Sequence, residues 1–220
     1  MVFTDDTIAA IATPLGTGGI GIIRISGPHS VEIATRLFHP HKAATPLKSH
    51  YLYYGVLVDP EDGHTVDEVL LSHMAKPRSY TKEDVVEVNC HGGPLSLKEI
   101  LSLVLKAGAR LAEPGDFTRR AFLNGRLDLA QAEAVIDLIE SKSTAGLRQA
   151  SSQLQGKLSE EVVLIKEGLM EILSVLEASI DFPEEDLEPF SSLELIADVD
   201  PLVSHIEKLL TTYTAGRLYR

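Results

Sequence analysis

In the stretch YTKEDVVEVNCHGGP, residues 80–94, apolar and polar side chains alternate over residues 86–91, and the stretch ends in Gly-Gly-Pro. Side chains two positions apart on a strand point to the same side, so Glu87, Asn89 and His91 are predicted to share one face. The opposite face would carry Val86, Val88 and Cys90. The glycines that follow allow a ligand or the backbone to approach closely before a helix begins at Pro94. The pattern predicts a strand whose polar face forms one side of a small-molecule pocket.

The residues around this strand indicate a mixed α/β domain. Glycine and proline punctuate short apolar runs of strand length, and two segments carry apolar residues at helical spacing. The predicted strands cover residues 7–12, 20–26, 51–58 and 69–74, and the predicted helices cover 29–38 and 95–107, the latter ended by Gly108. We expect strands to dominate, with helices packed against them.

From Asp128 onward the hydrophobic period changes to that of a helix. Asp128 and Gln131 have the spacing of a capping box. Apolar residues then recur every three or four positions from Leu154 to Ile180, and again over residues 193–212. We expect two long amphipathic helices, packed antiparallel across a loop at 182–192, in a partial helical bundle. The predicted fold class is therefore α+β, with domains at 1–124 and 125–220.

The charge is unevenly distributed between these two parts. Residues 1–124 contain 12 Lys and Arg against 14 Asp and Glu, whereas residues 125–220 contain 8 against 18. An acidic chain without a basic stripe is a poor autonomous binder of nucleic acid, because phosphate neutralisation supplies most non-specific affinity. If RNA is a partner, this chain would need help to bind it.

Targeting and metal signals are missing from the sequence. No run of 18 apolar residues occurs, and the first residues, MVFTDDTIAAIATP, lack a basic signal-peptide region. We therefore expect a cytoplasmic protein without membrane contact. A single cysteine, Cys90, excludes an internal disulfide and a cysteine-based zinc site, so no metal site is predicted.

A glycine-rich motif and a lone arginine permit two interpretations each. Residues 16–21, GTGGIG, satisfy GxGxxG, but a dinucleotide fingerprint must open a helix, and the residues that follow form a predicted strand. That strand carries Arg24 on the same face as Ile22 and Ser26. Arg24 is either an edge residue or half of a salt bridge, or a clamp for a carboxylate or phosphate.

Three further features have both a structural and a functional interpretation. Cys90 and His91 are adjacent on a strand and face opposite ways, which favours a buried structural cysteine over a thiolate-imidazole pair. The acidic residues of 181–188 fit a solvated loop, a cation site or a docking site for a basic partner. Residues 113–126, EPGDFTRRAFLNGR, predict a turn, a short helix and an Asn-Gly stop, with Arg126 exposed at the domain boundary.

Four stretches carry a family resemblance. ATPLGTGGIGIIRISG, YTKEDVVEVNCHGGP, EPGDFTRRAFLNGRLDLAQAEAVIDLI and SIDFPEEDL resemble, in this order, the N-terminal part of the tRNA modification GTPase family MnmE/TrmE. The resemblance implies a first domain similar to the tetrahydrofolate-binding domain of aminomethyltransferases. A helical domain would follow, into which a guanine-nucleotide domain is inserted. It also implies a binding site for 5-formyltetrahydrofolate or methylenetetrahydrofolate at Arg24, Glu87 and Arg126, and no catalytic residue in this chain.

The same resemblance implies partners and a reaction. Family members form homodimers through the N-terminal domain. With the flavoprotein MnmG (GidA), they install an aminomethyl or carboxymethylaminomethyl group on the wobble uridine of tRNA. No GxxxxGK[ST] loop occurs in the 220 residues, so GTP, Mg and K would bind only to a GTPase domain outside them.

We therefore expect a fragment of a longer enzyme, inactive alone, with half of the helical domain. Cys90 does not match the C-terminal cysteine motif of the family. The alternatives are a stand-alone folate-dependent one-carbon transferase and a non-catalytic dimerisation scaffold.

Overall fold

The computed structural model describes residues 6–14, 16–42, 46–181 and 192–216, and it gives side chains in the last helix for 195–211. The chain divides into two compact units, Met1–Arg126 and Leu127–Arg220. The sequence predicts the boundary two residues earlier, between residues 124 and 125. Among the described residues, no helix is both long enough and apolar enough to cross a membrane.

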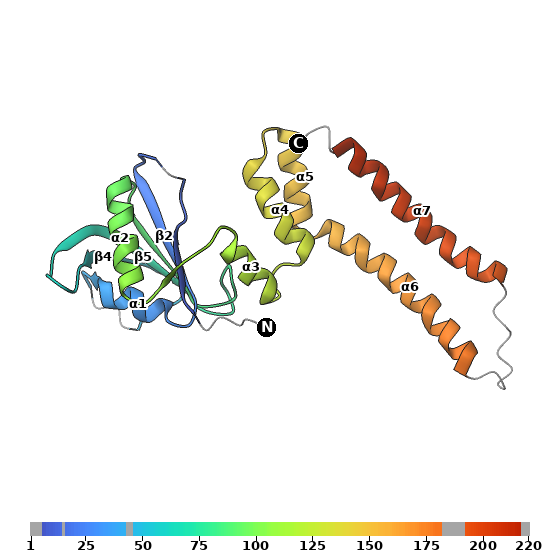
Figure 1. Ribbon diagram of the computed structural model, residues 1–220, viewed down its shortest axis with the longest axis horizontal. Coiled ribbons are helices and arrows are strands. Elements are labelled where there is room, and N and C mark those ends of the chain that lie inside the picture. The colour runs from blue at the N-terminus through green and yellow to red at the C-terminus, as the bar shows by residue number, and fades with distance from the viewer. Residues whose placement is uncertain (1–5, 15, 43–45, 182–191, 217–220) are drawn as a thin grey trace. The chain divides into compact units, whose positions relative to one another are not determined.

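The first unit is built on one seven-stranded sheet with the strand order β3-β4-β5-β6-β2-β1-β7 (Figure 1). Neighbouring strands run antiparallel, except that β7 pairs parallel to β1. The strands are β1 (Ile8–Ile11), β2 (Ile20–Ser26), β3 (Phe38–Pro40), β4 (Leu52–Val58), β5 (Thr65–Met74), β6 (Val85–His91) and β7 (Arg110–Leu111). The predicted α+β class is confirmed.

Two helices, α1 (Ser30–Leu37) and α2 (Pro94–Lys106), cover one face of this sheet (Figure 1). Pro94 occupies the first turn of α2, where its missing N–H leaves no hydrogen bond unmade. Gly108 follows the helix with φ 115, a backbone angle that favours glycine at a helix end. The core between helices and sheet contains Ile23, Ile25, Leu71, Val86, Val88, Ile33, Ile100 and Val104.

The predicted alternation along β6 is confirmed. Val86, Val88 and Cys90 are buried under the helices, whereas Glu87 and Asn89 are half-buried on the other face and His91 is exposed. Antiparallel pairing places Glu87 opposite Arg24 of β2 and opposite Ser72 of β5. The polar residues of β6 therefore lie on the sheet face opposite α1 and α2.

Some strands lie outside the predicted ranges. β5 begins at Thr65 rather than 69, because residues 65–68, which contain no apolar run, also pair with β4. β3 and β7 are edge strands of three and two residues. Edge strands this short bury too few side chains to show the alternation of apolar and polar residues by which a strand is predicted.

The second unit consists of helices in the described part of the chain: α4 (Leu129–Glu140), α5 (Thr144–Leu154), α6 (Lys157–Asp181) and α7 (Ser192–Gly216). The predicted capping box is present, since the Asp128 side chain accepts from the Gln131 amide at 2.8 Å and Gln131 Oε1 accepts from the Asp128 amide at 3.0 Å. The prediction that Leu154 begins the long helix was wrong. Leu154 ends α5, because Gly156 adopts φ 93 and interrupts the helix before α6 begins.

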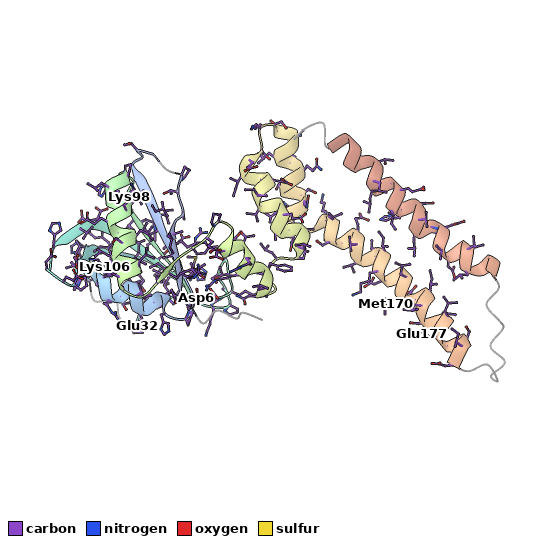
Figure 2. All side chains as sticks on the ribbon, in the orientation of Figure 1. Asp6, Glu32, Lys98, Lys106, Met170 and Glu177 are labelled. Atoms are coloured by element: carbon purple, nitrogen blue, oxygen red, sulfur yellow. The ribbon has the colours of Figure 1, made fainter. Side chains whose placement is uncertain are left out.

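Helices α6 and α7 pack against each other in opposite directions. Glu161, early in α6, pairs with His205 at 2.6 Å, whereas a Cβ at Gly168, further along α6, would meet Leu202, earlier in α7. The predicted antiparallel arrangement is confirmed. The predicted loop lies outside the described residues except for Ser192, which begins α7, and so do the acidic residues except for Asp181, which ends α6. Figure 2 shows side chains such as Met170 and Glu177 projecting from α6.

Candidate functional site

Arg24 and Glu87 form an ion pair on the face of the sheet opposite the helices. Their strands pair so that the two residues are direct neighbours, and Arg24 Nε donates to Glu87 Oε1 at 2.8 Å. The side chains are 30% and 20% exposed. Since β2 lies inside the sheet, Arg24 is half of a salt bridge rather than a residue at a sheet edge.

Two aromatic rings lie against the guanidinium groups of this region. The Arg24 guanidinium carbon is 5.6 Å from the centre of the Tyr80 ring and 5.7 Å from that of Phe117. The Arg126 guanidinium carbon is 4.8 Å from the Tyr80 ring, and Arg126 Nη1 also donates to the Tyr80 carbonyl at 3.3 Å. Arg24 and Arg126 therefore both lie against Tyr80, at distances where cation-π attraction is effective, and Glu87 joins them through its ion pair with Arg24.

Sequence reasoning did not single out Tyr80 or Phe117 as site residues. Tyr80 begins the stretch 80–94, whose signal is its polar alternation, and Phe117 lies in the stretch 113–126, whose signal is its turn residues. The one available signal was an aromatic residue beside turn residues in each stretch. That signal is weak, because a tyrosine or phenylalanine next to a turn more often serves the core.

Hydrogen bonds made by side chains fix Tyr80 and its neighbours against α3 (Asp116–Leu123) and the residues that follow it. The Tyr80 hydroxyl lies 2.9 Å from Thr118 Oγ1. Asn124 Nδ2 donates to the Thr81 carbonyl at 2.6 Å, and Lys82 Nζ donates to the Gly125 carbonyl at 2.8 Å. Two loops far apart in sequence are thus tied together immediately before Arg126.

A buried arginine lies beneath these loops. Arg120 is 4% exposed, and its guanidinium pairs with Asp6 (labelled in Figure 2) at 2.6 Å and with Glu83 at 3.1 Å. Glu83 Oε2 also accepts from Ser26 Oγ at 2.7 Å, two residues beyond Arg24 on β2. The network therefore connects β2, the loop that begins at Tyr80, and α3.

The other polar residues of the predicted pocket wall have partners within the sheet. Asn89 Nδ2 donates to the Leu70 carbonyl at 3.2 Å. His91 Nδ1 lies 2.6 Å from Asp67 Oδ1, and this hydrogen bond raises the pKa of His91. Burial acts to raise the pKa of Asp67, but the hydrogen bonds from the His91 backbone and ring outweigh it and lower that pKa. Asn89 and His91 thus join β6 to β5.

Cys90 is a structural residue, as predicted. Its side chain is buried on the helix-covered face, and its Sγ donates to the Gly21 carbonyl at 3.4 Å. Burial raises the pKa of this thiol to about 11. A thiol in this state is a poor nucleophile at neutral pH, and His91 faces the other side of the strand.

The glycine-rich segment leads into β2, so it opens no helix and is not a dinucleotide fingerprint, as predicted. A cavity of about 270 Å³ lies beside it and has no charged residue in its lining. The close approach expected at Gly92 is to backbone, since a Cβ there would stand 2.6 Å from the Gly18 carbonyl oxygen. The cavity is lined by Thr13, Pro14, Gly16, Thr17, Gly18, Ile20, Gly92 and Leu97, and so excludes all three predicted site residues.

A mixed-sheet unit with an arginine-glutamate site, followed by a helical unit, defines a two-domain α+β protein. Two family models match it: "GTP-binding protein TrmE N-terminus" over residues 7–126 and "MnmE helical domain" over residues 129–220. The chain therefore belongs to the TrmE/MnmE family.

Curated relatives that resemble this chain carry the name "tRNA modification GTPase MnmE". The Carboxydothermus hydrogenoformans protein is 49% identical over 218 residues, which cover 98% of this chain and 47% of that protein. The Moorella thermoacetica protein is 52% identical over 218 residues, which cover 97% of this chain and 46% of that protein. The chain spans about half the length of the curated relatives it matches.

Proposed function

We propose that this chain is the folate-binding and helical part of a tRNA modification GTPase. Its sheet domain would resemble the tetrahydrofolate-binding domain of aminomethyltransferases and bind 5-formyltetrahydrofolate or methylenetetrahydrofolate through Arg24, Glu87 and Arg126. The observation that carries the proposal is the Arg24–Glu87 ion pair beside Tyr80 and Arg126 on the open face of the sheet.

The chemistry of the pair suits a pterin ring. An ionised carboxylate accepts two parallel hydrogen bonds from a planar N–C–N edge, and the amino and ring N–H groups of a pterin supply such an edge. In the free protein Arg24 occupies only one oxygen of Glu87, through Nε. Among the described residues Glu87 Oε2 has no hydrogen-bond partner, so a ligand can bind there without first breaking the ion pair.

The proposed activity of the whole protein requires further components. With the flavoprotein MnmG (GidA), the protein would use the folate-bound carbon to form aminomethyl or carboxymethylaminomethyl uridine at the wobble position of tRNA in the cytoplasm. The 220 residues contain no GxxxxGK[ST] loop, so GTP, Mg and K would bind to residues outside them. Redox chemistry would take place on the flavin of the partner.

The open sheet face also supports the proposed homodimer. Large apolar side chains are exposed on neighbouring strands of this face, and the paired register of β4, β5, β6 and β2 places them on one side. Contiguous exposed apolar surface of this kind is typical of protein interfaces. These side chains are Ile20, Leu52, Tyr54 and Leu70.

Calorimetric titration of the chain with 5-formyltetrahydrofolate tests the proposal. The variants are Glu87→Gln and Arg24→Ala, with Glu99→Gln as a control, because Glu99 is exposed on α2. We expect saturable binding by the wild type and by Glu99→Gln, and a loss of about tenfold to a hundredfold in affinity for Glu87→Gln, because one charge-assisted hydrogen bond is removed. A folded wild-type chain that does not bind would refute the folate site and favour the dimerisation scaffold. Turnover of the folate by this chain alone would favour the one-carbon transferase.

A further inference from the structure

Arg126 carries a positive charge that no carboxylate neutralises among the described residues, although the chain is acidic overall. Its side chain is exposed, and its contacts are the ring and the carbonyl oxygen of Tyr80. Arg24 differs, because it is already paired with Glu87. Of these two guanidinium groups, Arg126 is the one whose charge remains available to an anion.

Tyr80 holds that guanidinium in two ways. The ring lies 4.8 Å from the guanidinium carbon, and the carbonyl of the same residue accepts from Nη1 at 3.3 Å. An arginine side chain that is already oriented loses less conformational entropy when it binds a carboxylate. The contact with Tyr80 therefore favours binding of an anion at Arg126.

The ring of Tyr80 is itself fixed. Its hydroxyl bonds to Thr118 on α3, and the adjacent residue Thr81 is completely buried with its carbonyl bonded to Asn124. The ring also faces Arg24, at 5.6 Å. Because Arg24 is also held by its ion pair with Glu87, a rotation of Tyr80 would disturb chiefly Arg126.

We propose that Tyr80 is a positioning residue that orients Arg126 toward a carboxylate of the glutamate tail of a folate, while Glu87 binds the pterin ring. This rests on the proposed folate-binding function and narrows its ligand class. The site selects a reduced folate, which has an anionic tail, over a free tetrahydropterin, which has none. Thr118 acts through Tyr80, by fixing its hydroxyl.

The test compares two ligands, 5-formyltetrahydrofolate and 6-methyltetrahydropterin, by anaerobic calorimetric titration of the full chain. The variants are Tyr80→Leu, Tyr80→Phe and Arg126→Ala. Tyr51→Leu is the control. Tyr51 is an exposed tyrosine whose ring, like that of Tyr80, lies near a cation, with Lys48 Nζ 5.8 Å from the ring centre. Thermal unfolding of each variant shows whether it is folded.

We expect Tyr80→Leu to lower the affinity for 5-formyltetrahydrofolate by about fivefold to thirtyfold and to change the affinity for 6-methyltetrahydropterin by less than about twofold. Tyr80→Phe, which keeps the ring, should restore most of the folate affinity. Adding Tyr80→Leu to Arg126→Ala should cause little further loss, because both changes remove one interaction. Tyr51→Leu should bind both ligands like the wild type.

Different results would overturn different proposals. Equal weakening of both ligands by Tyr80→Leu, or independent effects of Tyr80→Leu and Arg126→Ala, would refute the positioning role. Normal folate binding by Tyr80→Leu, alongside loss in Glu87→Gln, would refute only this inference and leave the folate site standing. A wild type that binds neither ligand would refute both.

A second measurement needs no ligand. The ring of Tyr80 should shift the NMR signals of the Arg126 side chain in the wild type and in Tyr80→Phe, but not in Tyr80→Leu. Arg126 signals that are identical in all three proteins would show that the contact is not maintained in solution, and the positioning role would be refuted.

Discussion

Replacing Arg120 by methionine should destabilise the sheet domain strongly. Arg120 is 4% exposed and pairs with Asp6 and Glu83, whose side chains are 29% and 22% exposed. Methionine fills similar space but leaves two carboxylates without their shared cation. Removing one partner of a buried ion pair costs about 3–5 kcal/mol, and the partial exposure of the two acids places the expected loss near the low end, at about 3 kcal/mol.

Urea unfolding can measure this loss, and the chain provides a reporter specific to the first unit. Cys90 is the only cysteine of the sequence and is buried in the sheet, so its labelling by a thiol reagent reports the opening of that unit. With an m-value of about 1.5 kcal/mol per molar urea, a loss of about 3 kcal/mol lowers the midpoint by about 2 M.

Arg120→Lys and Arg119→Met are the matched controls. Lysine keeps the charge but not the planar fork, so it should lose about 1–2 kcal/mol. Arg119 lies next to Arg120 on α3, but its side chain is 57% exposed and, among the described residues, pairs only with Asp116, so Arg119→Met should lose less than about 1 kcal/mol. An Arg120→Met protein within about 1 kcal/mol of the wild type would refute the role assigned to the network.

Three further predictions concern individual contacts. His91→Gln should destabilise the protein more at about pH 5.5 than at about pH 9 in urea titrations, because the raised pKa of His91 stabilises the fold below about 6.5 and this contribution disappears as pH rises through the folded-state value; equal losses at both pH values would contradict this. Cys90 should resist alkylation at about pH 8 until urea unfolds the sheet, because burial raises its pKa to about 11; rapid labelling of the native chain would contradict its buried position. The double variant Arg24→Leu/Glu87→Leu should unfold within about 1 kcal/mol of the wild type yet lose folate binding in calorimetry; a large loss of stability would mean that the pair serves the fold.

Much of the sheet domain could be predicted because its signals are local. The alternation of β6, the proline and glycine that bound α2, and the capping box at Asp128 each depend on residues close together in sequence. β3 and β7 could not be predicted in this way, since each forms only by pairing with a longer strand at an edge of the sheet.

The candidate site shows a second limit of prediction from sequence: the sequence does not tell which side chains pair with each other. The sequence indicates that Glu87 lies on a polar face and that Arg24 lies on a strand of its own, but their pairing depends on the register of two strands whose paired residues are 63 positions apart. The sequence pattern likewise does not distinguish Arg119 from Arg120. In the structure Arg119 is exposed, whereas Arg120 is buried in an ion network. Only the direction in which α3 meets the sheet distinguishes them.

The energetics of the Arg24–Glu87 pair favour a role in binding over a role in folding. A pair that is 30% and 20% exposed contributes about 0–1 kcal/mol to stability. β-branched residues at the same cross-strand positions would serve the sheet at least as well. The buried Arg120 network, by contrast, joins β2 to the loop that begins at Tyr80 through contacts within the protein. The buried charges around Arg120 thus stabilise the fold, whereas the Arg24–Glu87 pair on the open face keeps hydrogen-bonding capacity for a ligand.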